Sequence, residues 1–100
     1  MNYSNYYNEK DGVEGIAVIY NNFEAYIHHH PLDETYELIY GKALLFIDNK
    51  KYIIKAPYKT LIKKNIKHAL KPLSPFVILK YSFPKGKFED IKYTWLSSKL

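Results

Sequence analysis

The chain of 100 residues contains no cysteine and no arginine. Without cysteine it can form neither a disulfide framework nor a zinc finger, and it has no thiol nucleophile. Its fifteen basic residues are therefore all lysine, and the formal net charge is +5. Nucleic-acid readers depend on arginine to recognise guanine and phosphate, and these lysines alternate with apolar residues along the chain. We therefore expect a solvated lysine face and no nucleic-acid partner.

We expect neither a signal peptide nor a membrane-spanning segment in this sequence. Residues 1–7 show no basic stretch followed by an apolar core, so they do not resemble a signal peptide. The longest apolar runs, such as residues 76–79, are too short to span a bilayer. The expectation is a cytoplasmic protein with no membrane association.

The remaining composition is that of one globular domain, with 47% hydrophobic and 17% aromatic residues. Turn signals recur every eight to twelve residues and separate short runs rich in Ile, Leu, Val and Tyr. This pattern predicts an all-β sandwich or barrel. Strands are expected over residues 13–20, 23–28, 34–40, 42–48, 51–55, 58–63, 66–71 and 75–82.

The two ends of the chain are expected to lie outside this core. Residues 1–12 form an N-terminal arm, which is either mobile or adds a strand to a neighbouring subunit. Residues 13–83 form the β-barrel. Residues 84–100 form an extension that packs on the barrel or on a partner subunit, and its segment 88–96 fits a last strand or a short helix equally well.

Three of the four histidines stand in one run, directly before a turn and two acids. Side chains alternate along a strand, so His28 and His30 share a face, about 7 Å apart at Cα, while His29 points to the other face. A turn over 31–33 then starts a strand at Glu34, which can reach the same point, whereas Asp33 is expected to be a turn acid. Two neutral nitrogens and one carboxylate suit Fe(II), Mn, Ni, Co or Zn. The alternative is a surface cluster that binds metal only adventitiously.

This run resembles the first motif of the cupin superfamily, which is Gly, five residues, His-x-His, three or four residues, Glu, six residues, Gly. His28, His30, Glu34 and Gly41 match its spacing without a gap, and Asn22 stands in place of the first glycine. The resemblance covers roughly residues 13–83.

The second cupin motif is looser here. It corresponds to residues 56–68, a strand over 60–63 and a turn at Lys64-Asn65 that leads to His68, with Asn65 where glycine is common. The resemblance implies a double-stranded β-helix, or jelly roll, that holds a divalent metal ion through His28, His30, Glu34 and His68. Such a set leaves one or two positions open on a six-coordinate ion.

Several aromatic residues are expected near this ion. Tyr26 and Tyr36 are the candidate catalytic residues, because a phenol close to the metal can orient a bound oxygen. Further candidates for the pocket wall are Phe46, Tyr52 and Tyr81. For each of these side chains, packing in the core is the alternative role.

The function expected from the resemblance is that of a metal-dependent enzyme acting on a small organic molecule. Dioxygenase and isomerase chemistry fit equally well, with Fe(II), Mn, Ni or Zn as the ion. One alternative is a non-catalytic module that binds or senses a small molecule or a metal, and another is a relic site in a domain that only mediates assembly. We also expect a homodimer, because a small barrel with seventeen aromatic residues has apolar surface to cover.

Overall fold

The computed structural model describes residues 2–8, 12–83 and 94–100 of the chain. The described part contains strands and no helix. The strands are β1 (Asn2–Asn8), β2 (Gly12–Tyr20), β3 (Tyr26–His29), β4 (Glu34–Tyr40), β5 (Lys42–Ile47), β6 (Lys50–Lys55), β7 (Tyr58–Ile62), β8 (His68–Pro72), β9 (Phe76–Phe83) and β10 (Trp95–Lys99). The described residues therefore include no helix that could cross a membrane.

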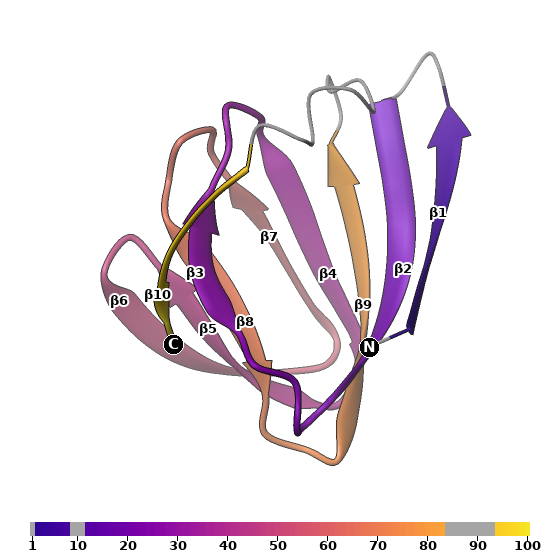
Figure 1. Cartoon of the computed structure of the whole chain (residues 1–100). Coiled ribbons are helices and arrows are strands. Elements are labelled where there is room, and N and C mark those ends of the chain that lie inside the picture. Colours follow the sequence, from indigo (N-terminus) through magenta and orange to yellow (C-terminus); the bar gives the residue numbers. More distant parts are fainter. Residues whose placement is uncertain (1, 9–11, 84–93) are drawn as a thin grey trace.

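The strands form two antiparallel five-stranded sheets that face each other (Figure 1). One sheet has the order β1-β2-β9-β4-β7, and the other has the order β10-β3-β8-β5-β6. Neighbours within a sheet are mostly distant in sequence, which is the connectivity of a jelly roll rather than of a meander. The predicted all-β jelly-roll class is confirmed.

The core lies between the sheets. In β4, alternate residues from Glu34 to Leu38 are buried, and in β2 the same period of two runs from Val13 to Ile19. This alternation arises because successive side chains of a strand point to opposite faces. The most buried side chains come from both sheets, and they include Leu38, Leu45, Ile62, His68 and Val77. One of these five is the histidine predicted to complete the metal site.

Strand bounds agree with the prediction over 34–40 and differ elsewhere by one to three residues. β3 begins at Tyr26 rather than residue 23, because Phe23 N–H bonds back to the carbonyl of Tyr20 in a turn. β8 begins at His68 rather than residue 66, because Ile66 N–H closes a similar turn onto Lys63. In both cases a local turn takes residues that the apolar pattern assigned to a strand.

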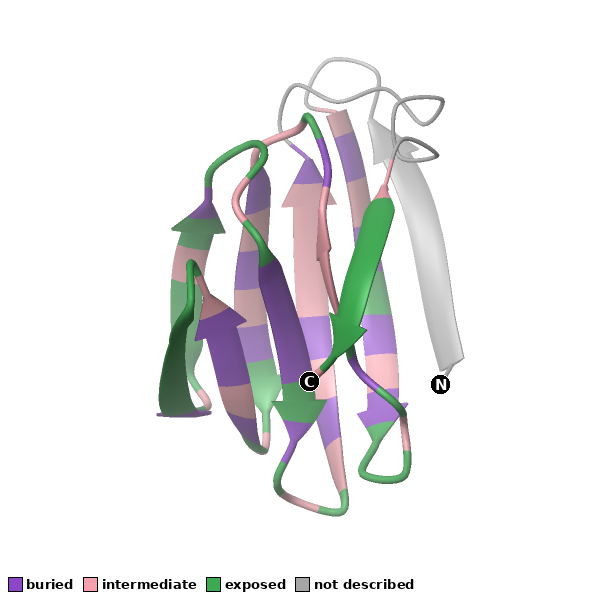
Figure 2. Ribbon diagram, turned by 60° about the vertical axis from the view of Figure 1, so that its left-hand side comes forward, coloured by how far each residue is buried: buried purple, intermediate pink, exposed green. Residues whose placement is uncertain are grey.

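Both termini add a strand to an edge of the sandwich. β1 pairs along β2 of the same chain from Asn2 opposite Val18 to Asn8 opposite Gly12. β10 pairs with β3, so the described part of the C-terminal tail is a strand and not a helix. Figure 2 shows β10 exposed along its length, on the surface of the molecule beside the chain end marked C. The rest of the tail segment, residues 88–93, lies outside the described residues.

The turns on either side of β5 depend on left-handed backbone. The β5–β6 hairpin turns through Asp48 and Asn49, with φ of 49° and 66°, and Asn and Asp tolerate this region better than other side chains. Gly41 has φ of 97° between β4 and β5, and a Cβ there would lie 2.7 Å from Ser74 Oγ and 2.8 Å from the carbonyl oxygen of Phe76. Position 41 therefore requires glycine, because its φ is left-handed and because a Cβ has no room there.

Candidate metal centre

Three histidines from two neighbouring strands converge between the sheets. His28 of β3 lies directly opposite His68 of β8 in the register of the sheet, and their rings are 4.3 Å apart between centroids. His30 follows β3, and its ring lies 5.0 Å from that of His68. One ring nitrogen from each of the three lies within 4.8 Å of the other two. This spacing allows all three histidines to bind one ion.

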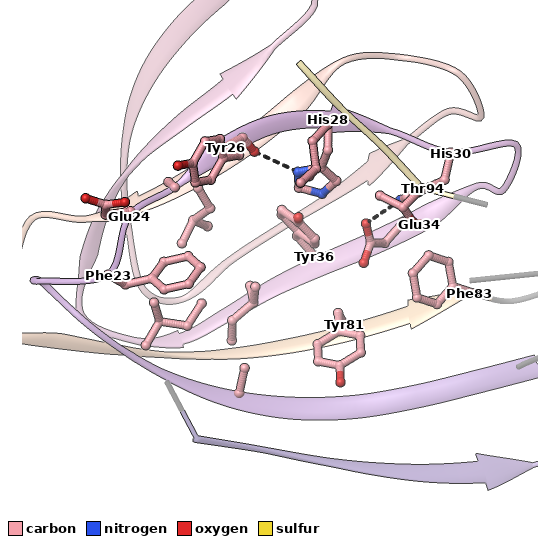
Figure 3. Close-up of a pocket in the computed structure, with 16 residues that line it drawn as sticks. Phe23, Glu24, Tyr26, His28, His30, Glu34, Tyr36, Tyr81, Phe83 and Thr94 are labelled. Atoms are coloured by element: carbon pink, nitrogen blue, oxygen red, sulfur yellow. Dashed lines mark hydrogen bonds and ion pairs between the residues drawn. The ribbon is translucent and has the colours of Figure 1, made fainter. Parts of the chain in front are cut away.

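Glu34 reaches the same cluster from the other sheet, where it begins β4. Its Oε1 atom lies 3.1 Å from Nε2 of His30 and 3.1 Å from Nε2 of His68. His68 is fully buried, and His30 and Glu34 are 3% and 5% exposed. Figure 3 shows the contact between Glu34 and His30. The structure thus brings together all four residues predicted as ligands.

Hydrogen bonds of the histidine rings determine which nitrogen faces the centre. His28 Nδ1 lies 2.8 Å from the carbonyl oxygen of Tyr26, His30 Nδ1 lies 3.0 Å from that of Leu32, and His68 Nδ1 lies 2.8 Å from that of Ile66. A carbonyl oxygen only accepts, so each Nδ1 carries the proton and donates it. In the neutral rings Nε2 then carries no proton and offers a lone pair. Metal-binding histidines in proteins are held in the same way.

The centre therefore gathers lone pairs and one carboxylate, with no donor of its own when the histidines are neutral. Such a set requires a proton or a cation between its members. Burial lowers the pKa of His30, but the hydrogen bond to Glu34 and its charge outweigh burial, so this pKa is raised. Burial would raise the pKa of Glu34, whereas His30 and His68 lower it below its usual value. The chemistry of the donors thus fits a divalent cation.

The pKa of the candidate ligand His28 is lowered in the fold. Burial lowers its pKa, and the neighbouring His68 lowers it further. A neutral imidazole is the form that binds a metal ion. The lowered pKa of His28 therefore favours the neutral form, which could bind a cation.

Two hydrogen bonds donated by backbone amides join the turns that carry the candidate ligands. The amide of Lys64 donates to Asp33 Oδ1 over 2.8 Å, and the amide of Asn65 donates to the carbonyl oxygen of His30 over 2.8 Å. Asn65 has φ of 65°, the conformation for which glycine is common at this position of the second motif. Asp33 therefore positions the turn before His68 rather than the ion.

His29 lies apart from the centre. Its ring stacks on Trp95 of β10, with centroids 5.3 Å apart and planes 22° from parallel. The two residues are opposite each other in the register of β3 and β10. His29 Nδ1 is buried without a hydrogen-bond partner among the described residues. Within the histidine triplet, His28 and His30 thus face the cavity, whereas His29 packs on Trp95.

A cavity of about 570 Å³ opens beside the histidines, and Figure 3 shows side chains from both sheets around it. Tyr36 is 7% exposed, lines the cavity and lies 5.7 Å from His68 between ring centroids. Tyr26 lines it from a site that is 41% exposed, and Tyr81 is a third tyrosine of the wall. Phe46 and Tyr52 are not among the lining residues, so their prediction as wall residues is wrong.

The two errors have simple causes. Phe46 follows Leu45, which points into the core, so its own side chain points to the opposite face of β5. Tyr52 belongs to β6 at the edge of its sheet and is 46% exposed. The wall contains Leu96 and Thr94 instead. Sequence reasoning missed these two residues because the pairing of β10 with β3 has no local signal.

Comparison with known proteins gives no match to a protein-family model or to a curated protein sequence. Solved structures do match. A cupin-like protein from Thermotoga maritima is 15% identical with a TM-score of 0.71, over 90% of this chain and 67% of that one. Salicylate 1,2-dioxygenase from Pseudoaminobacter salicylatoxidans is 9% identical with a TM-score of 0.74, over 96% of this chain and 30% of that one.

A third solved structure is the DMSP lyase from Ruegeria pomeroyi, which is 11% identical with a TM-score of 0.67, over 79% of this chain and 45% of that one. The chain therefore spans less than half the length of either enzyme. At such identities the likeness concerns the fold. By its strand order and its two facing sheets, the chain has a jelly-roll fold, and this fold is similar to those of the cupin-like protein and the dioxygenase.

Proposed function

We propose that this chain is a metal-dependent cupin enzyme that acts on a small organic molecule and holds a divalent ion through His28, His30, His68 and Glu34. The observation that carries the proposal is the convergence of lone pairs on one buried point, with each histidine fixed by its own Nδ1 hydrogen bond. A divalent ion supplies Lewis acidity there and, in the case of Fe(II), redox chemistry with O₂. The dioxygenase and lyase among the structural neighbours support this class of activity.

The residues around the ion have separate tasks in this proposal. Three neutral histidines and one carboxylate would hold the ion and would leave part of its coordination shell for a bound molecule. Burial raises the pKa of the Tyr36 phenol well above its usual value, and the charge of Glu34 adds to this effect. Tyr36 therefore remains protonated and donates a hydrogen bond to an oxygen of the bound molecule. Tyr26, at the exposed end of the cavity, contacts the part of the molecule that lies farther from the ion.

Metal titration tests the proposed centre. Tag-free protein purified without metal is titrated with Fe(II), Mn, Ni and Zn, and we expect one ion per chain. His68→Ala should abolish stoichiometric binding, because it removes a ligand of the buried set. His29→Ala is the matched control, since it alters the same histidine-rich region but leaves the cluster intact. Equal binding by wild type and His68→Ala would refute the four-ligand centre.

The enzymatic half of the proposal needs a separate test. Metal-loaded protein is incubated with a panel of small phenols, keto acids and hydroxy acids, with and without O₂, and products are followed by mass spectrometry. We expect conversion of at least one compound class by wild type and none by Glu34→Gln. Binding without turnover across the panel would favour a non-catalytic binding module.

A further inference from the structure

The charge of the cavity wall is distributed unevenly. Its apolar side chains come from both sheets and include Ile19, Phe23, Leu70, Leu79, Phe83 and Leu96. The charged side chains among the described lining residues are Glu24 and Glu34, and none of the lining residues is a lysine. The chain has fifteen basic residues, so this wall differs sharply from the rest of the surface. An anion inside the cavity finds no cationic side chain in the described wall.

Among the described residues of the wall no side chain rivals the ion, which would supply the strong positive charge inside the cavity. Two positive charges on the ion and one negative charge on Glu34 leave a net charge of one, since the histidines are neutral ligands. One anionic headgroup on the open positions neutralises that charge. A second anionic group on the same molecule would lie against apolar side chains without a partner, and burial of an unpaired charge is strongly unfavourable.

The other end of the cavity carries an ion pair. Figure 3 places Glu24 and Phe23 at the opposite end of the cavity from His30 and Phe83. Glu24 Oε1 lies 2.9 Å from Lys99 Nζ of β10, and both side chains are more than half exposed. Lys99 lowers the pKa of Glu24 through this hydrogen bond and its charge. The charge of Lys99 is therefore already engaged and does not attract a second anion.

We propose that the cavity selects molecules with an apolar body and one oxygen headgroup of at most one negative charge, and that Glu24 excludes a second anionic end by engaging Lys99. The inference rests on the proposed metal centre, because the headgroup binds at the open positions of the ion. It adds a substrate class, which the centre alone does not define. Polyhydroxylated molecules are also excluded, because their hydroxyl groups would lose water against an apolar wall.

Three eight- or six-carbon acids test this selection. Octanoate and octanedioate share a headgroup and a chain and differ only in the second carboxylate, whereas gluconate has one carboxylate and a polyhydroxylated body. Binding to the Co(II)-loaded full chain is measured by calorimetry and by the visible spectrum of Co(II). We expect octanoate to bind at least about tenfold more tightly than either competitor.

The outcomes separate the selection from the metal centre. If Co(II) itself does not bind, the proposed function is overturned and the inference with it. If Co(II) binds but octanoate has no advantage over octanedioate or gluconate, the inference is overturned and the metal centre stands. A change of the Co(II) spectrum on addition of octanoate shows in addition that the headgroup reaches the ion.

The role of Glu24 is tested by variants of opposite effect. Glu24→Gln releases Lys99 and should tighten octanedioate binding about two- to fivefold, the size expected for one exposed ion pair. Lys99→Gln leaves Glu24 without its cation and should weaken octanedioate binding by a similar factor. Glu14→Gln is the matched control, because Glu14 does not line the cavity, and it should leave binding unchanged. Equal octanedioate affinity in all of these variants would overturn the role of Glu24.

Discussion

Replacement of Glu34 by glutamine separates a metal ligand from a structural acid, because it removes the charge and keeps the shape. In the metal-free protein Glu34 Oε1 contacts Nε2 of both His30 and His68 at 3.1 Å. Hydrogen bonds that involve a charged group contribute about 1.5–3 kcal/mol each. The glutamine amide can still donate to one Nε2 lone pair, and such a neutral bond contributes about 1 kcal/mol.

Desolvation acts in the opposite direction. Glu34 is 5% exposed, and beside a neutral glutamine His30 can give up its proton, so that no uncompensated charge stays buried. We therefore expect Glu34→Gln to change the free energy of unfolding of the metal-free protein by less than about 2 kcal/mol. Metal affinity should fall far more. Loss of an outer-shell partner already costs 10- to 100-fold, so loss of a direct ligand should cost at least about 100-fold, or about 2.7 kcal/mol.

The assay combines urea denaturation of metal-free protein with calorimetric titration of Zn(II) or Co(II), for wild type and Glu34→Gln. Asp33→Asn is the matched control, since this neighbouring acid accepts a bond from Lys64 and is not part of the histidine cluster. Its metal affinity should stay close to that of wild type. Unchanged metal affinity of Glu34→Gln, together with a large loss of stability, would show that Glu34 is a structural acid and refute the reasoning.

Three further predictions concern the turn at Gly41, the titration of His30 and the phenol of Tyr36. Gly41→Ala should destabilise the fold by about 2–4 kcal/mol, because alanine is strained in the left-handed region and its Cβ would lie close to the Phe76 carbonyl oxygen. Urea denaturation measures this loss, and metal affinity should stay unchanged. A variant as stable as wild type would contradict the prediction. Because the pKa of His30 is raised above 6.5 in the metal-free fold, its stabilising contribution is complete below pH 6.5 and is lost as pH rises through the folded pKa. Denaturation at pH 6 and 8 checks the sign, and His30→Gln should remove this slope. Tyr36→Phe should leave Co(II) affinity unchanged and weaken octanoate binding about tenfold by the loss of one bond to a charged group, as measured by calorimetry; unchanged octanoate affinity would argue that the hydroxyl does not reach the headgroup.

The fold could be predicted from local signals. Period-two alternation and frequent turn residues indicate short antiparallel strands, and β4 has the predicted bounds. The spacing of His28, His30 and Glu34 is also local, since a strand, a turn and the next strand place them together. His68 is different because it lies 34 residues beyond Glu34. The resemblance to a known motif indicated it, whereas periodicity alone could not.

Other parts of the site depend on pairing between distant strands, which no local pattern encodes. The last strand could pair with more than one free sheet edge, and in the structure β10 pairs with β3. This pairing places Trp95 on His29 and Leu96 in the cavity wall. The same limit explains the error over Tyr52, since an aromatic residue fits an edge strand as well as an interior wall. Dimerisation and the cytoplasmic location stay predictions.

The sparse pairing between β3 and β8 affects how firmly β3 and β10 are held to the rest of their sheet. These two strands are paired at one register position, His28 opposite His68, whereas β5 and β8 are paired at five. The strand pairing that joins β10 and β3 to the rest of their sheet therefore runs through His28 and His68, two of the proposed ligands. An ion held by both histidines would cross-link the two halves, and hydrogen exchange in β3 and β10 should slow on metal loading. In a chain without cysteine, the metal would serve as the staple that a disulfide provides elsewhere.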